Sequence, residues 1–404
     1  MPIPYIKPDR WLKYDKMALV DALTDAKAAV LSLASMPYQR SWAETLQQME
    51  LKREVAGTSK IEGADFTDRE LDVALADEGT ETGALTRSQR QARAAKRAYE
   101  WIADLPKDRP IDRELIFAVH RLIVTGCDDD HCEPGALRGQ DQNVTFGRPS
   151  HRGAAGGMEC REAFDALCGA LGQEFRGHDP LIQALALHYH LGAMHPFQDG
   201  NGRTARALEA LMLQRARLKD DLFIAMSNYY YDEKDRYLAI LAEVRSNGFD
   251  LTLFLKFGLE GIHTQCRRLL EEIRGQVWKS LFRDVMGRMY GRLLSTRKRG
   301  LARRQLAILE QLLSEEAPIE HILLYHLIDH EYRALKGAET AFIRDLNYLL
   351  GLGAITIESV DIDKDEAFMI SVRLEWATEI TETAFYEELE KMPEAKSRLI
   401  PSTR

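Results

Sequence analysis

A twelve-residue stretch from His195 to Arg206, HPFQDGNGRTAR, combines the groups that phosphate chemistry requires. Gly200 and Gly202 permit positive φ, so that successive backbone N–H groups can point into one concavity. This concavity opens at the expected start of a helix, where unsatisfied N–H donors and the helix dipole favour an anion. The stretch therefore predicts a site for a phosphate-bearing ligand.

Charged side chains surround this predicted anion site. Arg203 and Arg206 are three positions apart and share one face of the expected helix. Cations near a helix N-terminus cost about 0.3–1 kcal/mol each, a cost that a bound polyphosphate would offset through bidentate guanidinium contacts. Asp199 offers the hard oxygen ligand that Mg²⁺ prefers, and His195 has the pKa range of a general base. Together these groups indicate phosphoryl or nucleotidyl transfer.

Two helices are expected to position the stretch. An apolar stripe of helical period precedes it over 180–194, and a second stripe follows it through Ala205, Leu208 and Met212. Seven residues, His195 to Asn201, interrupt the pattern. His188 and His190 on the first helix are two positions apart and face different directions, so we expect packing or hydrogen bonding there rather than metal binding.

The stretch resembles the motif of Fic-domain proteins, H-x-F-x-[DE]-G-N-G-R-x-x-R, and matches it at every defined position. By this resemblance, His195 is the general base for a Ser, Thr or Tyr hydroxyl of a protein target, and Phe197 anchors the loop in the core. Asp199 would hold Mg²⁺. The resemblance implies that the remaining positions bind the phosphates of ATP: Gly200 and Gly202 as the anion hole, Asn201 and Arg203 at the α- and β-phosphates, and Arg206 at the γ-phosphate.

The implied reaction is transfer of AMP from ATP to the target and to the enzyme itself. The same family resemblance leaves open the removal of AMP, with Glu62 positioning a water molecule, or the transfer of another nucleotide such as UMP. The target protein and the modified residue cannot be identified from the sequence.

A second match lies upstream, where residues 58–63, TSKIEG, resemble the family's inhibitory-helix motif, [ST]-x-x-x-E-[GN]. Thr58 and Glu62 are spaced i, i+4 and so share a face of one helical turn. A Glu62 carboxylate paired with Arg206 would withdraw that arginine from the γ-phosphate. We therefore expect Thr58, Glu62 and Gly63 to form an inhibitory segment on an N-terminal helix.

Two further assignments follow from position in the family. Residues 140–150 fall where the family carries a flap hairpin that aligns a target segment by strand addition, although this glycine-rich sequence also fits a solvated loop. Tyr229 and Tyr230 are candidate adenine contacts, with packing in the core as the alternative for each.

The composition is that of a multidomain globular protein. The chain has 404 residues, with 45% hydrophobic residues, 29% charged residues and a formal net charge of −9. Five irregularly spaced cysteines indicate free thiols in a reducing cytosol. No apolar run reaches the length of a transmembrane helix or a signal peptide. We expect a cytoplasmic protein without a membrane partner.

We expect a mainly α fold in three domains: an N-terminal helical domain over 1–108, a Fic core with a flap hairpin over 109–275, and a C-terminal domain over 276–404. The C-terminal helices are followed by strands at 354–357 and 368–374, which predicts a winged helix-turn-helix.

A basic cluster at the start of that domain makes DNA binding the alternative function: Arg292, Arg297, Lys298, Arg299, Arg303 and Arg304. The expected second helix, however, offers only Arg344 as a base reader, and the loop over 361–366 is acidic. We therefore favour dimerisation or docking of a protein target as the use of this domain.

Overall fold

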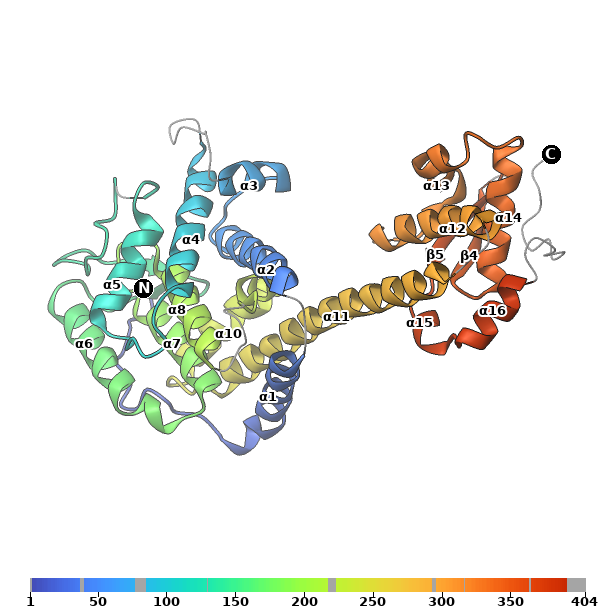
Figure 1. Ribbon diagram of the computed structural model, residues 1–404. Coiled ribbons are helices and arrows are strands. Elements are labelled where there is room, and N and C mark those ends of the chain that lie inside the picture. Colours follow the sequence, from blue (N-terminus) through green and yellow to red (C-terminus); the bar gives the residue numbers. More distant parts are fainter. Residues whose placement is uncertain are drawn as a thin grey trace. The chain divides into compact units, whose positions relative to one another are not determined.

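The computed structural model describes residues 2–36, 40–76, 85–128, 130–216, 223–292, 296–315, 317–362 and 365–390. The fold is mainly helical, as the sequence predicts (Figure 1). The chain divides into two compact units, Met1–Glu271 and Glu272–Arg404. The finer division of the first unit at residue 108 stays a prediction. Of the helices described, none is both long and apolar enough to cross a lipid bilayer.

The first unit begins with an extended segment that leads into its first helices. Threonine capping boxes at Thr67 and Thr86 begin two of these helices, because each hydroxyl accepts from a backbone N–H three residues on. The elements before the functional loop are η1 (Met17–Leu19), α1 (Val20–Ser35), α2 (Arg40–Ile61), α3 (Asp68–Leu75), α4 (Arg87–Ala103), α5 (Arg113–Val124) and α6 (Met158–Gly172).

Helix α7 (Pro180–Met194) is the central helix of this unit. Its N-cap Asp179 accepts from Leu181 N–H at 3.0 Å, and Pro180 occupies the first turn, where no N–H partner is needed. Its side chains are buried on nearly every face, as expected of a core helix. Helix α8 (Asn201–Arg215) packs beside it, and α9 (Met226–Asp232) and α10 (Lys234–Ser246) follow (Figure 1). Helix α11 (Thr252–Gly291) belongs to the first unit up to Glu271, and its remaining residues belong to the second unit.

A short hairpin forms where the flap is predicted. Strand β1 (Thr145–Phe146) pairs antiparallel with β2 (His151–Arg152), and Gly147 allows the turn with its φ of 76°. Ile3 from the N-terminal segment lies parallel to β2: its N–H donates to Ser150 O at 2.9 Å, and its carbonyl accepts from Arg152 N–H at 2.8 Å. The solvated-loop alternative is therefore excluded.

The second unit has its own hydrophobic core, which includes Phe282 of α11 and the fully buried Trp376. A three-stranded antiparallel sheet in the order β3-β5-β4 covers part of it. The elements are α12 (Thr296–Ser314), β3 (Ile319–Glu320), α13 (His321–Ile328), η4 (Asp329–Glu331), α14 (Ala338–Gly351), β4 (Ile355–Ile362), β5 (Asp365–Val372), α15 (Trp376–Glu379) and α16 (Glu382–Glu390). The two predicted strands are present, while the winged-helix assignment stays a prediction.

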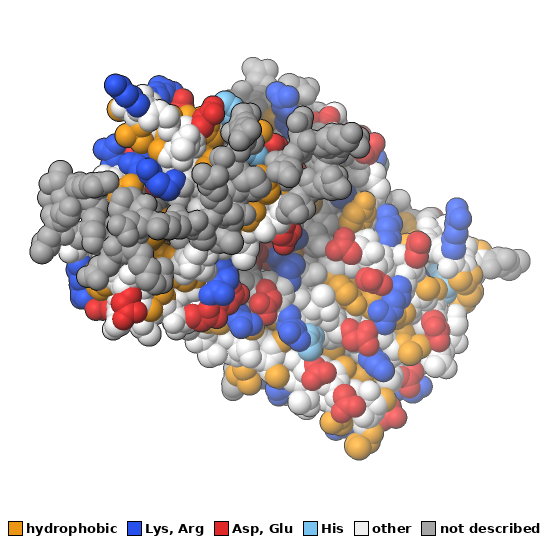
Figure 2. All heavy atoms as spheres, turned by 90° about the vertical axis from the view of Figure 1, so that its right-hand side faces the viewer, with side chains coloured by type: hydrophobic (Ala, Val, Ile, Leu, Met, Phe, Trp, Pro, Cys, Tyr) orange, Lys and Arg blue, Asp and Glu red, His pale blue; other side chains and the backbone are white. Residues whose placement is uncertain are grey.

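Half of the basic cluster of the second unit is paired internally. Arg304 forms a buried ion pair with Asp345, to which it donates at 2.8 Å. Two more ion pairs join Arg303 to Glu331 and Arg292 to Glu382, each at 2.7 Å. The side chains of residues 297–299 and of the acidic loop over 361–366 lie outside the described part. Figure 2 shows acidic and basic side chains interspersed on the face drawn. DNA binding by this unit stays a prediction.

Candidate functional site

His195 ends α7 in the left-handed conformation, with φ 53°. Its backbone N–H still bonds to Leu191 O at 2.9 Å, so the chain turns sharply only after the helix is complete. The imidazole Nδ1 lies 2.8 Å from Gly192 O. Because a carbonyl can only accept, Nδ1 carries the proton and Nε2 keeps its lone pair. His195 is therefore held in the tautomer that a general base requires.

The flap covers one face of this imidazole. Phe146 of β1 stacks on His195 with ring centroids 3.9 Å apart, and the Arg245 guanidinium lies 4.6 Å from the Phe146 ring. Burial lowers the pKa of His195 to about 4, although the hydrogen bond to Gly192 and the charge of Glu62 act in the opposite direction. The imidazole is thus neutral at pH 7 and can accept a proton.

The loop after His195 is closed by Asn201. Its side-chain oxygen accepts from Phe197 N–H at 2.8 Å, and its amide nitrogen donates to Phe197 O at 2.8 Å. Phe197 is 1% exposed and stacks on His120 at 3.7 Å, which agrees with the expected anchoring role. The Asn201 side chain is therefore held within the loop, and its backbone N–H belongs to the first turn of α8.

Two residues that sequence reasoning missed support the loop from α5 and the segment after it. His120 accepts from Gly135 N–H at 2.9 Å through Nδ1 and donates to Asp199 O at 3.0 Å through Nε2. Cys132 Sγ accepts from Asp199 N–H at 3.3 Å. The contacts of His120 and Cys132 with Asp199 span 79 and 67 positions of the chain, so no local spacing pattern could have indicated them.

The first turn of α8 forms the predicted anion cradle. Gly200 caps the helix with φ 74°, and a Cβ atom there would lie 2.7 Å from Val124 Cγ1. The first intrahelical bond runs from Thr204 N–H to Gly200 O, so the N–H groups of Asn201, Gly202 and Arg203 precede it. These three donors are the ones that a phosphate at this terminus would meet.

Arg203 adds a buried guanidinium group to this cradle. The residue is 2% exposed, and its Nη2 lies 2.7 Å from Asp128 Oδ2. Its Nε and Nη1 atoms are buried and have no hydrogen-bond partner among the described residues. Buried donors without partners cost about 1–3 kcal/mol each, a cost that a bound anion would remove. The site therefore fits a phosphate group.

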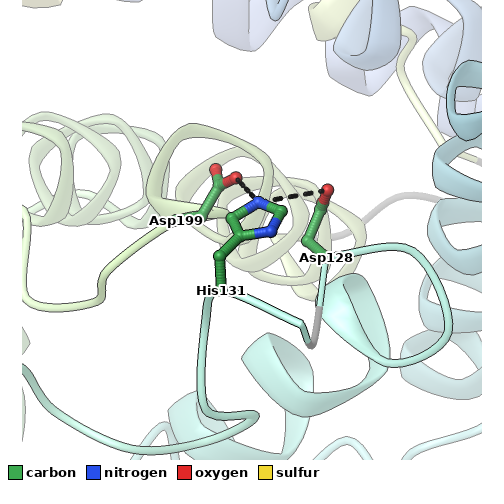
Figure 3. Close-up of side chains that lie close together, drawn as sticks. All are labelled: Asp128, His131 and Asp199. Atoms are coloured by element: carbon green, nitrogen blue, oxygen red, sulfur yellow. Dashed lines mark ion pairs between the residues drawn. The ribbon is translucent and has the colours of Figure 1, made fainter.

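Asp199 lies in a cluster with Asp128 and His131, whose candidate ligand atoms are all within 4.8 Å of one another. Figure 3 shows His131 between the two carboxylates, with Nε2 at 3.4 Å from Asp199 Oδ2 and 3.9 Å from Asp128 Oδ1. Arg87 from α4 also reaches both carboxylates, at 2.6 Å from Asp128 and 3.5 Å from Asp199. Sequence reasoning found only Asp199 in this cluster.

The two carboxylates differ in their availability to a cation. Asp128 is fully buried, and although burial opposes its ionisation, Arg203 and Arg87 outweigh that effect and lower its pKa to about 2. Its oxygens are thereby engaged by arginines. The Asp199 side chain is 35% exposed and borders the cleft. Asp199 therefore fits a single protein carboxylate on a hard cation that takes its other oxygens from a substrate.

The upstream segment meets the functional loop at Arg206, which is 2% exposed. Arg206 Nε donates to Thr58 Oγ1 at 2.9 Å, and its Nη2 donates to Glu62 Oε1 at 2.6 Å. Burial raises the pKa of Glu62, but the charge of Arg206 outweighs it, so the pKa lies below its usual range. The structure thus brings together the three residues that the two sequence matches pair.

Two glycines make this meeting sterically possible. Gly63 adopts φ 92° directly after Glu62, where α2 ends. A Cβ atom on Gly202 would lie 2.3 Å from Glu62 Oε1. The Glu62 carboxylate therefore lies against the first turn of α8, over the cradle itself.

A cleft of about 630 Å³ lies in front of these residues. Its apolar wall comes from α10 and includes Tyr237, Leu238 and Leu241. Tyr229 and Tyr230 lie in the core and are not among the residues that line the cleft: Tyr230 donates to Glu209 at 2.8 Å, and Tyr229 packs on Phe257 with ring centroids 5.0 Å apart. The aromatic side chains that line the cleft are Phe146 and Tyr237, and an adenine contact by Tyr229 or Tyr230 stays a prediction.

Comparison with known proteins agrees with this geometry. Residues 110–213 match the sequence model of the Fic/DOC family. The fold is similar to that of a Fic family protein from Desulfovibrio desulfuricans, with a TM-score of 0.53, 17% identity, and coverage of 92% of this chain and 98% of that chain. A fragment of Fic-1 from C. elegans matches with a TM-score of 0.53 and 19% identity over 63% of this chain and 73% of the fragment. At these identities the similarity shows the fold.

Proposed function

We propose that the chain, whose residues 110–213 match the model of the Fic/DOC family, transfers AMP from ATP to a hydroxyl group of a protein target and of itself. The observation that carries the proposal is the position of the base beside the cradle. His195, with a neutral imidazole whose Nε2 keeps its lone pair, lines the same cleft as Asn201 and Gly202 of the first turn of α8. Arg203, the next residue of that turn, has two buried donors without a partner among the described residues.

His195 has the tautomer and the protonation state for the chemical step. As the target oxygen forms a bond to the α-phosphorus, Nε2 takes the hydroxyl proton. The bond between the α-phosphorus and the oxygen that bridges to the β-phosphorus breaks, and pyrophosphate leaves. The hydrogen bond from Nδ1 to Gly192 holds the ring while the charge develops, at 2.8 Å.

Binding and charge stabilisation fall to the first turn of α8. The N–H groups of this turn and the free Nε and Nη1 of Arg203 would bind the phosphates, and Arg206 would bind the γ-phosphate. Asp199 would hold Mg²⁺, which neutralises charge on the phosphate oxygens when bound. Catalysis then depends on position and electrostatics rather than on covalent chemistry by the protein.

The Glu62 contact supports an inhibited ground state. A carboxylate 2.6 Å from Arg206 engages the arginine that the γ-phosphate would need. ATP could still bind in this state, but with its γ-phosphate away from Arg206 and its α-phosphorus out of line for attack. We propose that Glu62 must leave Arg206 before transfer occurs.

Mass spectrometry of the protein after incubation with ATP and Mg²⁺ tests the transferred group. The Glu62→Gly variant should carry an AMP adduct on a Ser, Thr or Tyr, and the same variant with His195→Ala should carry none. Parallel reactions with UTP, CTP and GTP establish nucleotide preference. A phosphate adduct, or an adduct only from another nucleotide, would contradict AMP transfer.

A further inference from the structure

Helix α2 carries a polar residue at every fourth position of the face that meets the rest of the unit: Glu50, Glu54, Thr58 and, just after the helix, Glu62. This i, i+4 spacing places them along one line. Glu50, Glu54 and Thr58 are each 1% exposed or less. A docked helix usually buries an apolar stripe. The buried polar line therefore needs a partner at each position.

The partners come from different helices. Glu50 accepts from Arg268 of α11 at 2.5 Å, and Thr58 and Glu62 both contact Arg206 of α8. Glu54 lies between these two ion pairs and is 0% exposed. Like Glu50, it lies outside both sequence matches, and it is the nearer of the two to Thr58 and Glu62 along the helix.

Three donors converge on the Glu54 carboxylate. Ser227 N–H of α9 donates to Oε2 at 2.8 Å, Tyr99 of α4 donates to Oε1 at 2.8 Å, and the Ser227 hydroxyl also donates to Oε1. Burial raises the pKa of Glu54 to about 7 despite these donors. A buried carboxyl group with all of its contacts directed to neighbouring helices fixes both the rotation and the height of α2.

Close backbone contact strengthens this constraint one turn further along. A Cβ atom on Gly57 would lie 2.4 Å from the carbonyl carbon of Ser227 and 2.5 Å from Asn228 N. The two backbones therefore touch where only glycine fits. A slip of α2 by one residue would move it by about 1.5 Å and turn it by about 100°, which would carry Glu62 away from Arg206.

We propose that Glu54 is a positioning residue for the inhibitory segment: bonded to Ser227 and Tyr99, it holds α2 at the height and rotation that bring Thr58 and Glu62 to Arg206. The proposal rests on the proposed function, because it takes the Glu62–Arg206 pair to block transfer. Residue 54 acts eight positions before Glu62 and touches neither the cleft nor Arg206 in the contacts described.

The chemistry of the polar line also makes α2 a releasable helix. Undocking returns the carboxylates of Glu50 and Glu54 to water and so recovers solvation that their burial costs. An apolar stripe of the same length would gain nothing on exposure. Signals that loosen α2 would therefore release Arg206 while α7 and α8 stay folded.

Hydrogen exchange of the full chain tests the proposal without any assumption about activity. Glu54→Ala leaves the buried Ser227 N–H without its acceptor, which should accelerate amide exchange over residues 50–62 about 10-fold or more. Peptides from α7 and α8 should exchange as in wild type. The matched control is Gln48→Ala, on an exposed position of the same helix, which should leave exchange unchanged. Unchanged exchange in Glu54→Ala would overturn the proposal.

Nucleotide transfer provides the second readout. Glu54→Ala should raise transfer towards the level of Glu62→Gly, and the double variant should not exceed Glu62→Gly alone, since both act through one contact. If Glu62→Gly transfers the nucleotide and Glu54→Ala does not, the positioning role of Glu54 would be overturned. Inactivity of Glu62→Gly would instead contradict the proposed function, and the exchange experiment would still decide the role of Glu54.

A milder variant covers the case in which Glu54→Ala unfolds the first unit. Tyr99→Phe removes one of the three donors and keeps the ring, which is fully buried. It should give a smaller acceleration of exchange over the same residues. If Glu54→Ala unfolds, and Tyr99→Phe folds but exchanges residues 50–62 at the wild-type rate, the proposal would be overturned.

Discussion

Arg206 donates to the Glu62 carboxylate at 2.6 Å across 144 positions of sequence. The same arginine donates to Thr58, and a side chain on Gly202 would collide with Glu62. Thr58 and Glu62 therefore contact the first two turns of α8 directly. This relationship determines what each of the following variants should do.

Asp128→Asn should weaken ATP binding. Asp128 is the partner of the buried Arg203 at 2.7 Å, and its amide replacement removes the charge that orients this guanidinium. Hydrogen bonds to charged groups contribute about 1.5–3 kcal/mol, so we expect the KM for ATP to rise about 10-fold or more. The KM is measured from steady-state rates of nucleotide transfer at varied ATP concentration, with Asp128→Asn introduced into the Glu62→Gly variant. Asp130→Asn, whose side chain is 82% exposed, is the control and should bind ATP normally.

Asp199→Ala should abolish Mg²⁺-dependent transfer. The Asp199 carboxylate lines the cleft and lies farther from Arg87 and Arg203 than the Asp128 carboxylate does, so its removal takes away the proposed metal ligand. We expect a loss of about 100-fold or more at any Mg²⁺ concentration. Transfer titrated against Mg²⁺ checks it, with Asp130→Ala as the exposed control. Full activity in Asp199→Ala would exclude the metal role.

The pH dependence of transfer should reflect the low pKa of His195, about 4. The neutral imidazole is the active form, so lowering the pKa extends activity to lower pH. The kcat/KM of Glu62→Gly should therefore be flat between about pH 6 and 8 and fall only below about pH 5. Phe146→Ala exposes the ring and should move the fall towards the ordinary histidine value, about 6.5. If kcat/KM of Glu62→Gly, which keeps Phe146, falls with a midpoint near pH 6.5, the proposed lowering of the His195 pKa by burial would be contradicted.

Docking of α2 should weaken as the pH rises through about 7. The pKa of Glu54 is raised from 4.5 to about 7 in the docked state, so its contribution is complete below 4.5, falls as the pH rises towards 7, and is gone once the docked carboxyl has ionised. The groups that face it are Tyr99 of α4, Ser227 and Tyr230 of α9, and Glu209 and Arg206 of α8.

Hydrogen exchange over residues 50–62, corrected for intrinsic rates, should therefore be faster at pH 8.5 than at pH 6. Glu54→Gln resembles the protonated group, so its exchange should show no such dependence. Equal pH dependence in wild type and Glu54→Gln would assign the effect to another group.

The parts of the site that lie close together in sequence were predictable. Residues His195 to Arg206 lie between and at the start of two consecutive helices, so their spacing indicated that their side chains and the first turn of α8 lie close together. Thr58 and Glu62 were found because a helical turn puts them on one face and the motif names their partner. The mainly α architecture also followed from local pattern, whereas the flap hairpin was expected from its position in the family.

Residues that act across the fold were not predictable. Three such residues reach the loop from earlier elements: Arg87 from α4, His120 from α5 and Asp128 from the segment after α5. Nothing in the sequence around them distinguishes them from surface charges or core histidines. Tyr229 and Tyr230 show the opposite limit, because an aromatic run looks the same whether it lines a cleft or packs in a core. Only the tertiary contacts separate the two cases.

The same reason applies to the basic cluster of the second unit. Composition shows six cations without an acidic neighbour in sequence, whereas Arg303 and Arg304 pair with Glu331 and Asp345 from later elements. A charge pattern predicts a binding surface only where the fold leaves the charges unpaired.

Label transfer from α-³²P-ATP with Mg²⁺ tests the central claim most directly, with wild type, Glu62→Gly and Glu62→Gly/His195→Ala compared side by side. We predict weak labelling of wild type and no labelling of the double variant. Labelling of Glu62→Gly should be stronger than that of wild type by about 10-fold or more, as expected for loss of a charge-assisted contact. Reactions with γ-³²P-ATP should leave the protein unlabelled. Equal labelling of wild type and Glu62→Gly, or label retained without His195, would contradict the account.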